Sequence, residues 1–182
     1  MKIGFAKARQ TPRRIAIIGP GGAGKSVLAT EISRRTGLPV VHLDPIFWGE
    51  GWTRAAADQV RPAFEAAIAS DRWILDGNFL WDERIPDDGR FDRADTVVFL
   101  DLPRTTCLWR VLRRLARDRG RRRPDLPEGC GEGVDLDLLC WIWGYPKTDR
   151  PRVLELLDGL EETVTVRRLR SPSDVRRFLD SL

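Results

Sequence analysis

Eight consecutive residues near the N-terminus have the types and spacing of a phosphate-binding loop. They fit the pattern G-x-x-x-x-G-K-[ST] and read Gly19-Pro20-Gly21-Gly22-Ala23-Gly24-Lys25-Ser26. The glycines let the backbone curl so that successive N–H groups point at phosphate oxygens. In such loops the lysine reaches the β- and γ-phosphates of a nucleoside triphosphate and the serine binds Mg²⁺. We therefore expect Lys25 to act on a phosphoryl group and Ser26 to bind a metal ion.

The residues on either side of this loop favour the strand and the helix that must hold it. Residues 14–18 form a short β-branched run, which is typical of a buried parallel strand. Apolar residues at helical spacing follow in residues 27–32, and the N-terminus of that helix adds its dipole to phosphate binding. The expected nucleotide contacts of this segment are Gly19, Gly21, Gly22, Ala23, Gly24, Lys25, Ser26 and Val27.

Length and composition indicate one soluble domain, residues 1–182, which can bury about 70% of its unfolded surface. Residues 1–13 are basic and lack an apolar stretch, so we expect a loose N-terminal extension and not a secretory signal. No apolar run is long enough to span a membrane. The three cysteines lack metal-ligand spacing, so we expect reduced thiols and a cytoplasmic protein that does not bind membranes.

The positive charge is carried mostly by arginine and is concentrated locally. The formal net charge is +4 and the sequence pI is about 9.3. Many of the arginines fall within residues 104–123, and the planar arginine fork suits bidentate phosphate contacts. This local excess suggests a polyphosphate ligand or nucleic acid.

Predicted strands and helices alternate along the whole chain. The strands are expected at residues 14–19, 39–43, 73–76, 96–101 and 163–169, and the helices at 25–36, 58–70, 105–119, 135–143, 150–160 and 173–182. Such alternation predicts an α/β three-layer sandwich, with a parallel sheet and helices on both faces. Ligands of such sheets bind at the carboxyl ends of the strands. Residues 120–133, rich in glycine and arginine, are expected to be a lid or disordered.

The second predicted strand ends in a carboxylate beside the phosphate loop, Asp44. It could orient water on Mg²⁺ or accept a proton from an acceptor hydroxyl; the alternative is a helix cap or turn aspartate. We assign the neighbouring His42 a packing role. Three aromatic residues follow at Phe47, Trp48 and Trp52. They either belong to the core or form the floor of an acceptor pocket.

The third predicted strand is an apolar run that closes on Asp76 and is followed by Gly77. A run of this kind is typical of the Walker-B element, which binds Mg²⁺ directly or through water. The alternative is an Asp-Gly turn without a ligand. We expect Asp76 to hold Mg²⁺ together with Ser26.

The helix after the fourth strand carries four arginines at spacings of three and four, which place them on one helix face: Arg110, Arg113, Arg114 and Arg117. Four like charges on one face repel each other unless an anion lies against them. The face could therefore clamp a triphosphate, bind nucleic acid or be solvated.

Together these segments resemble the adenylate-kinase-like branch of P-loop kinases, and most closely small bacterial proteins named DNA topology modulation proteins. The resemblance rests on the phosphate loop and on residues 42–44, 73–78, 100–104, 107–110, 119–121, 141–143 and 169–172. It implies sheet order 2-3-1-4-5 and a mobile lid at about residues 118–146. It also implies that Arg110 packs on adenine, that Arg114 contacts phosphate, and that the loop containing Ser171 holds the adenine ring.

The chain departs from adenylate kinases where these hold the phosphate of their acceptor. Those enzymes have an arginine soon after the Asp-Gly element, whereas here the next arginine is Arg84. The aspartate at position 44 looks more like small-molecule kinases that phosphorylate a hydroxyl group.

We therefore predict an ATP- and Mg²⁺-dependent phosphotransferase with an unknown small-molecule acceptor, acting as a monomer or homodimer. Lys25, Arg114 and Mg²⁺ would stabilise charge on the transferred group, and Arg113 or Arg117 could assist once the lid closes. Asp44 would position or deprotonate the acceptor. The alternatives are a nucleic-acid-binding regulator switched by ATP, and a P-loop ATPase whose acceptor is water.

Overall fold

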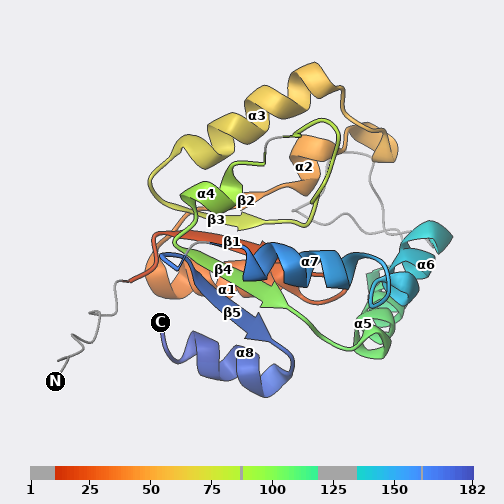
Figure 1. Ribbon diagram of the computed structural model, residues 1–182. Coiled ribbons are helices and arrows are strands. Elements are labelled where there is room, and N and C mark those ends of the chain that lie inside the picture. The colour runs from red at the N-terminus through yellow and green to blue at the C-terminus, as the bar shows by residue number, and fades with distance from the viewer. Residues whose placement is uncertain (1–10, 87, 119–134, 161) are drawn as a thin grey trace, which may run out of the picture.

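The computed structural model describes residues 11–86, 88–118, 135–160 and 162–182 (Figure 1). Five strands form one parallel sheet in the order β2-β3-β1-β4-β5. The strands are β1 (Arg14–Ile18), β2 (Val40–His42), β3 (Trp73–Asp76), β4 (Thr96–Leu100) and β5 (Thr165–Leu169). The predicted α/β fold and its strand order are thereby confirmed.

Helices cover both faces of the sheet, so each central strand is buried on two sides. In β1, Ile15 and Ile17 face one core cluster, while Ala16 and Ile18 face the other. The first cluster is closed by α1 (Lys25–Thr36), α8 (Pro172–Leu179) and the buried face of α5 (Arg104–Asp118). The second is closed by α3 (Ala57–Ala69), α4 (Arg90–Arg93) and α7 (Asp149–Asp158). This arrangement explains why the strands read as continuous apolar runs.

Three short helical segments were not expected: α2 (Asp44–Phe47), the 3₁₀ turn η1 (Glu50–Trp52) and α4. Each spans only three or four residues, too few to show helical periodicity in a sequence.

The predicted lid at residues 118–146 lies partly outside the described residues. Its described part includes α6 (Leu136–Gly144), which begins at an Asp135 cap that accepts from the Leu138 N–H. Leu138 and Ile142 of α6 pack against the phosphate loop, where they would lie 3.2 Å from a Cβ atom added to Gly21. The closing motion of a lid, and the domain limits, stay predictions. Within the described residues, no helix combines the length and apolar character needed to span a membrane.

Candidate functional site

The phosphate loop joins β1 to α1 and is pressed against two other elements. Gly22 has a φ of +75°, and a Cβ there would lie 2.4 Å from the backbone oxygen of Cys107 in α5. Gly19 has a φ of +144°, and a Cβ there would lie 2.7 Å from the oxygen of Leu100 in β4. Both positions therefore require glycine for conformation and for space.

Lys25 folds back across this loop. Its Nζ atom donates to the carbonyl oxygens of Gly19 at 3.0 Å and Pro20 at 3.1 Å. Burial lowers the pKa of Lys25, while the negative charges of Asp76 and Asp44 oppose that shift. Two carboxylates near the carboxyl ends of the strands therefore act electrostatically on the charged lysine.

Asp76 and His42 form a pair across the ends of β3 and β2. They face each other in the strand register, and His42 Nδ1 lies 2.7 Å from Asp76 Oδ2. A polar partner on the next strand thus holds the ring of His42, and the packing role assigned to it stays a prediction. The other oxygen of Asp76, Oδ1, is buried and has no hydrogen-bond partner within the described residues.

Asp44 is the first residue of α2, and the position of the helix cap belongs to Leu43. Its charge raises the pKa of Lys25, which places Asp44 close to the lysine. Gly77 serves the packing of this corner, since a Cβ there would lie 2.6 Å from that of Leu43.

Two of the four arginines predicted to share one face of α5 lie at the phosphate loop. Arg110 Nη1 donates to the Ala23 oxygen at 2.9 Å, and the charge of Arg114 contributes to lowering the pKa of Lys25. Arg113 instead lies over the exposed ring of Trp109, 5.2 Å from its centroid. Arg117 is exposed on the same helix.

The aromatic residues near Asp44 divide between core and surface. Phe47 is fully buried and stacks on Phe79, with 4.0 Å between ring centroids. Trp48 contacts Trp52, which is exposed. Phe47 is therefore a core residue and not the floor of a pocket.

Arg84, the next arginine after β3, has a structural role. Its guanidinium pairs with Asp82 and donates to the carbonyl oxygens of Phe47 and Ala55, both at 3.0 Å. It is buried, and these bonds leave it little capacity to hold an acceptor phosphate.

Sequence reasoning missed the support beneath the loop. Asn78 Oδ1 accepts from the Gly19 N–H at 3.2 Å. The buried Arg90 holds the same segment through the oxygens of Gly77, at 3.2 Å, and Asn78, at 2.9 Å. No short-range pattern reveals these contacts. Beyond the carboxyl end of the edge strand β5, Ser171 caps α8 by accepting from the Asp174 N–H.

This arrangement is the fold of the P-loop kinases. The chain is similar to shikimate kinase from Acinetobacter baumannii, with 16% identity, a TM-score of 0.60 and coverage of 96% of this chain and 93% of that one. It is also similar to an unliganded sugar kinase from Janibacter sp., with 17% identity, a TM-score of 0.51 and coverage of 93% and 94%.

A third similar structure is deoxyadenosine kinase from M. mycoides with bound dATP, with 14% identity, a TM-score of 0.50 and coverage of 92% and 97%. No known family and no curated protein sequence matches the chain. At these identities the similarity establishes the fold, and it gives no support to the name DNA topology modulation protein.

Proposed function

We propose that this protein is an ATP- and Mg²⁺-dependent phosphotransferase that acts on a hydroxyl group of a small molecule. The observation that carries the proposal is the placement of Lys25, whose ammonium lies across the phosphate loop near Asp44, Asp76 and Arg114. A cation fixed at this point can stabilise the charge of a transferring phosphoryl group.

The residues present fit a magnesium nucleotide. The loop is bare at Gly19, Gly21 and Gly22, where a Cβ atom would meet β4, α6 and α5, and the buried Oδ1 of Asp76 lacks a partner within the described residues. Ser26, at the start of α1, and Asp76 would hold the ion, directly or through water. Bound Mg²⁺ would neutralise phosphate charge.

We assign the remaining roles from the positions of the residues near the carboxyl ends of the strands. Arg110 and Arg114 would contact the nucleotide from α5, with Arg117 further along the same helix. Val27, exposed at the start of α1, and Ser171 would border the nucleoside. Asp44 would hold the acceptor hydroxyl and accept its proton.

A thermal-shift titration with Mg·ATP tests nucleotide binding. A ligand at 100 times its dissociation constant adds about 2.7 kcal/mol to stability, which is about 5–11 °C in Tm for a chain of this size. Production of ADP should then rise in a screen of hydroxyl compounds, beginning with shikimate and deoxyadenosine. A melting temperature that does not change with Mg·ATP would contradict the proposal. A salt-sensitive rise in melting temperature with duplex DNA alone would favour the nucleic-acid-binding regulator.

Substituting the two aspartates separately should give different defects. Asp44→Asn should keep Mg·ATP affinity within about threefold but lower acceptor-dependent turnover about 100-fold, because it removes the proton acceptor. Asp76→Asn should impair the Mg²⁺-dependent step whatever the acceptor, because it removes a ligand of the ion. Steady-state kinetics with Mg²⁺ and acceptor varied in turn measure both, with the exposed Asp71→Asn as the control.

Equal loss of Mg·ATP affinity in the Asp44 and Asp76 variants would contradict the assignment. Asp44 would then belong to the metal site, and the argument for a hydroxyl acceptor would fall.

A further inference from the structure

A cavity of about 530 Å³ opens at the carboxyl ends of β4 and β5. In the strand order it lies on the opposite side of β1 from Asp44 and Asp76. Pro20, the second residue of the phosphate loop, contributes to its lining. The cavity therefore adjoins the loop without including the carboxylates assigned to the acceptor and the metal. Its volume lies within the range of small-molecule sites.

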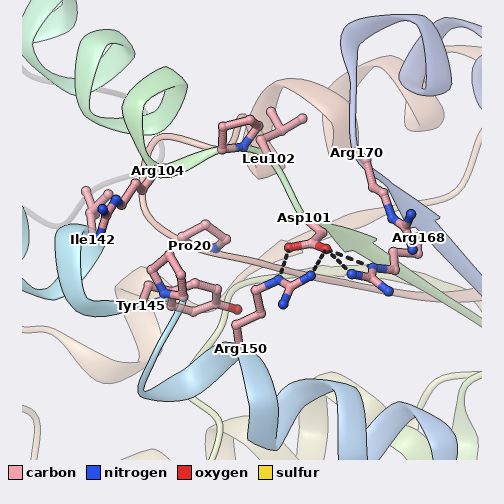
Figure 2. Close-up of a pocket in the computed structure, with 11 residues that line it drawn as sticks. Pro20, Asp101, Leu102, Arg104, Ile142, Tyr145, Arg150, Arg168 and Arg170 are labelled. Carbon is pink, nitrogen blue, oxygen red and sulfur yellow. Dashed lines mark hydrogen bonds and ion pairs between the residues drawn. The ribbon is translucent and has the colours of Figure 1, made fainter.

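The two sides of the cavity differ in chemistry. Figure 2 shows Ile142 and Tyr145 on one side and Arg168 and Arg170 on the other, with Pro20 between them. Leu102, Pro103 and Pro146 extend the apolar lining. Arg104 also lies beside Ile142, where it donates to the Trp143 oxygen at 3.0 Å and lies over the Trp143 ring (Figure 2). A ligand that matches both sides has an apolar body and a charged end.

The charge of the arginine side is positive although a carboxylate lies within it. Asp101 accepts from Arg150 Nε at 2.8 Å and Nη2 at 3.2 Å, and from Arg168 Nε at 2.8 Å and Nη2 at 2.6 Å (Figure 2). Burial alone would raise the pKa of Asp101, but these bonds hold it below its usual value. Asp101 is thus ionised at neutral pH and neutralises one arginine, which leaves one charge from this trio and another from Arg170.

Several donors around the cavity have no acceptor within the described residues. The Tyr145 hydroxyl is buried and unpartnered, in a side chain that is 3% exposed. The Nη1 groups of Arg150 and Arg168 are not used in the bonds to Asp101. The guanidinium of Arg170 pairs with no carboxylate of the described chain. The Tyr145 hydroxyl is the buried donor of this set, and a buried donor without an acceptor is costly. Arg150 and Arg168 are partly exposed and Arg170 is exposed, so their free N–H groups are open to a ligand that enters the cavity.

We propose that this cavity binds an organic anion, a phosphate monoester or a carboxylate. Its charged group lies on Arg150, Arg168 and Arg170, and its apolar body lies against Pro20 and Ile142. Arginine binds the planar and tetrahedral oxygens of such groups in bidentate fashion. Tyr145 donates to an oxygen of the same group. The cavity adjoins the phosphate loop at Pro20 but does not include Lys25, Asp44 or Asp76, so we expect both sites to be filled at once.

The test uses the full chain and isothermal titration with phenyl phosphate and benzoate at constant ionic strength, in the presence of a saturating non-hydrolysable ATP analogue. We expect binding in the wild type and in Lys25→Met, which lacks the loop lysine. Arg170→Gln should weaken binding about tenfold or more, because it removes a charge-assisted contact. Tyr145→Phe should weaken it several-fold. Arg167 is exposed and directly precedes Arg168 in β5, and Arg167→Gln should leave the affinity for the probe unchanged.

Four results would overturn the proposal: no binding at millimolar probe, equal weakening by Arg167→Gln, competition with the ATP analogue, or loss of binding in Lys25→Met. The melting temperature of each ligand-free variant is compared with that of the wild type. An unchanged value shows that weaker binding reflects a change at the site and not unfolding of the protein. Inorganic phosphate that binds as tightly as phenyl phosphate would remove the apolar subsite. A rise in the KM of the acceptor with added phenyl phosphate would also overturn the separation of this cavity from the acceptor site at Asp44, whereas a change in kcat without competition would support it.

Discussion

Replacing Lys25 by methionine is expected to lower ATP turnover by about 10³-fold or more. The Nζ atom is the cation nearest to where the phosphate loop would place the transferring group, held there by the Gly19 and Pro20 carbonyls. Removing one fixed cation or donor from such a site costs about 10²–10⁵ in rate. Single-turnover production of ADP measures the loss directly, and Lys147→Met, at an exposed position, is the matched control.

The same substitution should leave the protein as stable as before, or more stable. Burial lowers the pKa of Lys25 in the folded state, so folding the charged lysine costs free energy at neutral pH. That cost persists at low pH and is relieved only as the pH rises through the lowered pKa. We therefore expect the difference in the free energy of unfolding between variant and wild type, measured by urea unfolding from pH 6 to pH 10, to become smaller with increasing pH. A variant that fails to fold, or one with normal turnover, would contradict this account.

Gly22→Ala is expected to destabilise the protein by about 2–5 kcal/mol and to abolish Mg·ATP binding. A left-handed conformation costs a non-glycine residue about 1–2 kcal/mol. The added Cβ would also lie 2.4 Å from the Cys107 oxygen and 2.8 Å from Val111 Cγ2. The backbone oxygen cannot rotate away, so the loop or α5 must shift.

Gly37→Ala provides the matched control. Gly37 has a similar φ of +68°, but a Cβ there would meet nothing within 4 Å. It should therefore cost about 1 kcal/mol and leave nucleotide affinity unchanged. Denaturant unfolding and Mg·ATP titration of both variants decide the matter. Equal effects would show that conformation alone, and not contact with α5, restricts position 22.

The sequence predicted the fold well because its signals are local. The run that became β3 was placed at its observed bounds, residues 73–76, and α1 at residues 25–36. Buried strands need continuous apolar side chains, and a helix after the phosphate loop needs apolar residues on one face. Gly37 ends α1 as expected, with its N–H bonded to the Ser33 oxygen at 2.8 Å.

The geometry of the site could not be predicted in the same way, because it depends on pairing between distant segments. His42 meets Asp76 only through the register of β2 against β3. Asp101 is 49 residues from Arg150 and 67 from Arg168 in sequence. Each of these residues, taken alone, has the appearance of an ordinary surface or strand-end residue.

The contact between Gly22 and the backbone of Cys107 also bears on the entropy of ligand binding. It joins the first turns of α5 to the phosphate loop, and the Arg110 bond to Ala23 adds a second connection. The loop amides and the Arg110 side chain are therefore ordered relative to one another when the chain folds. A nucleotide that enters does not have to immobilise them separately, so less conformational freedom is lost on binding and more of the contact energy appears as affinity.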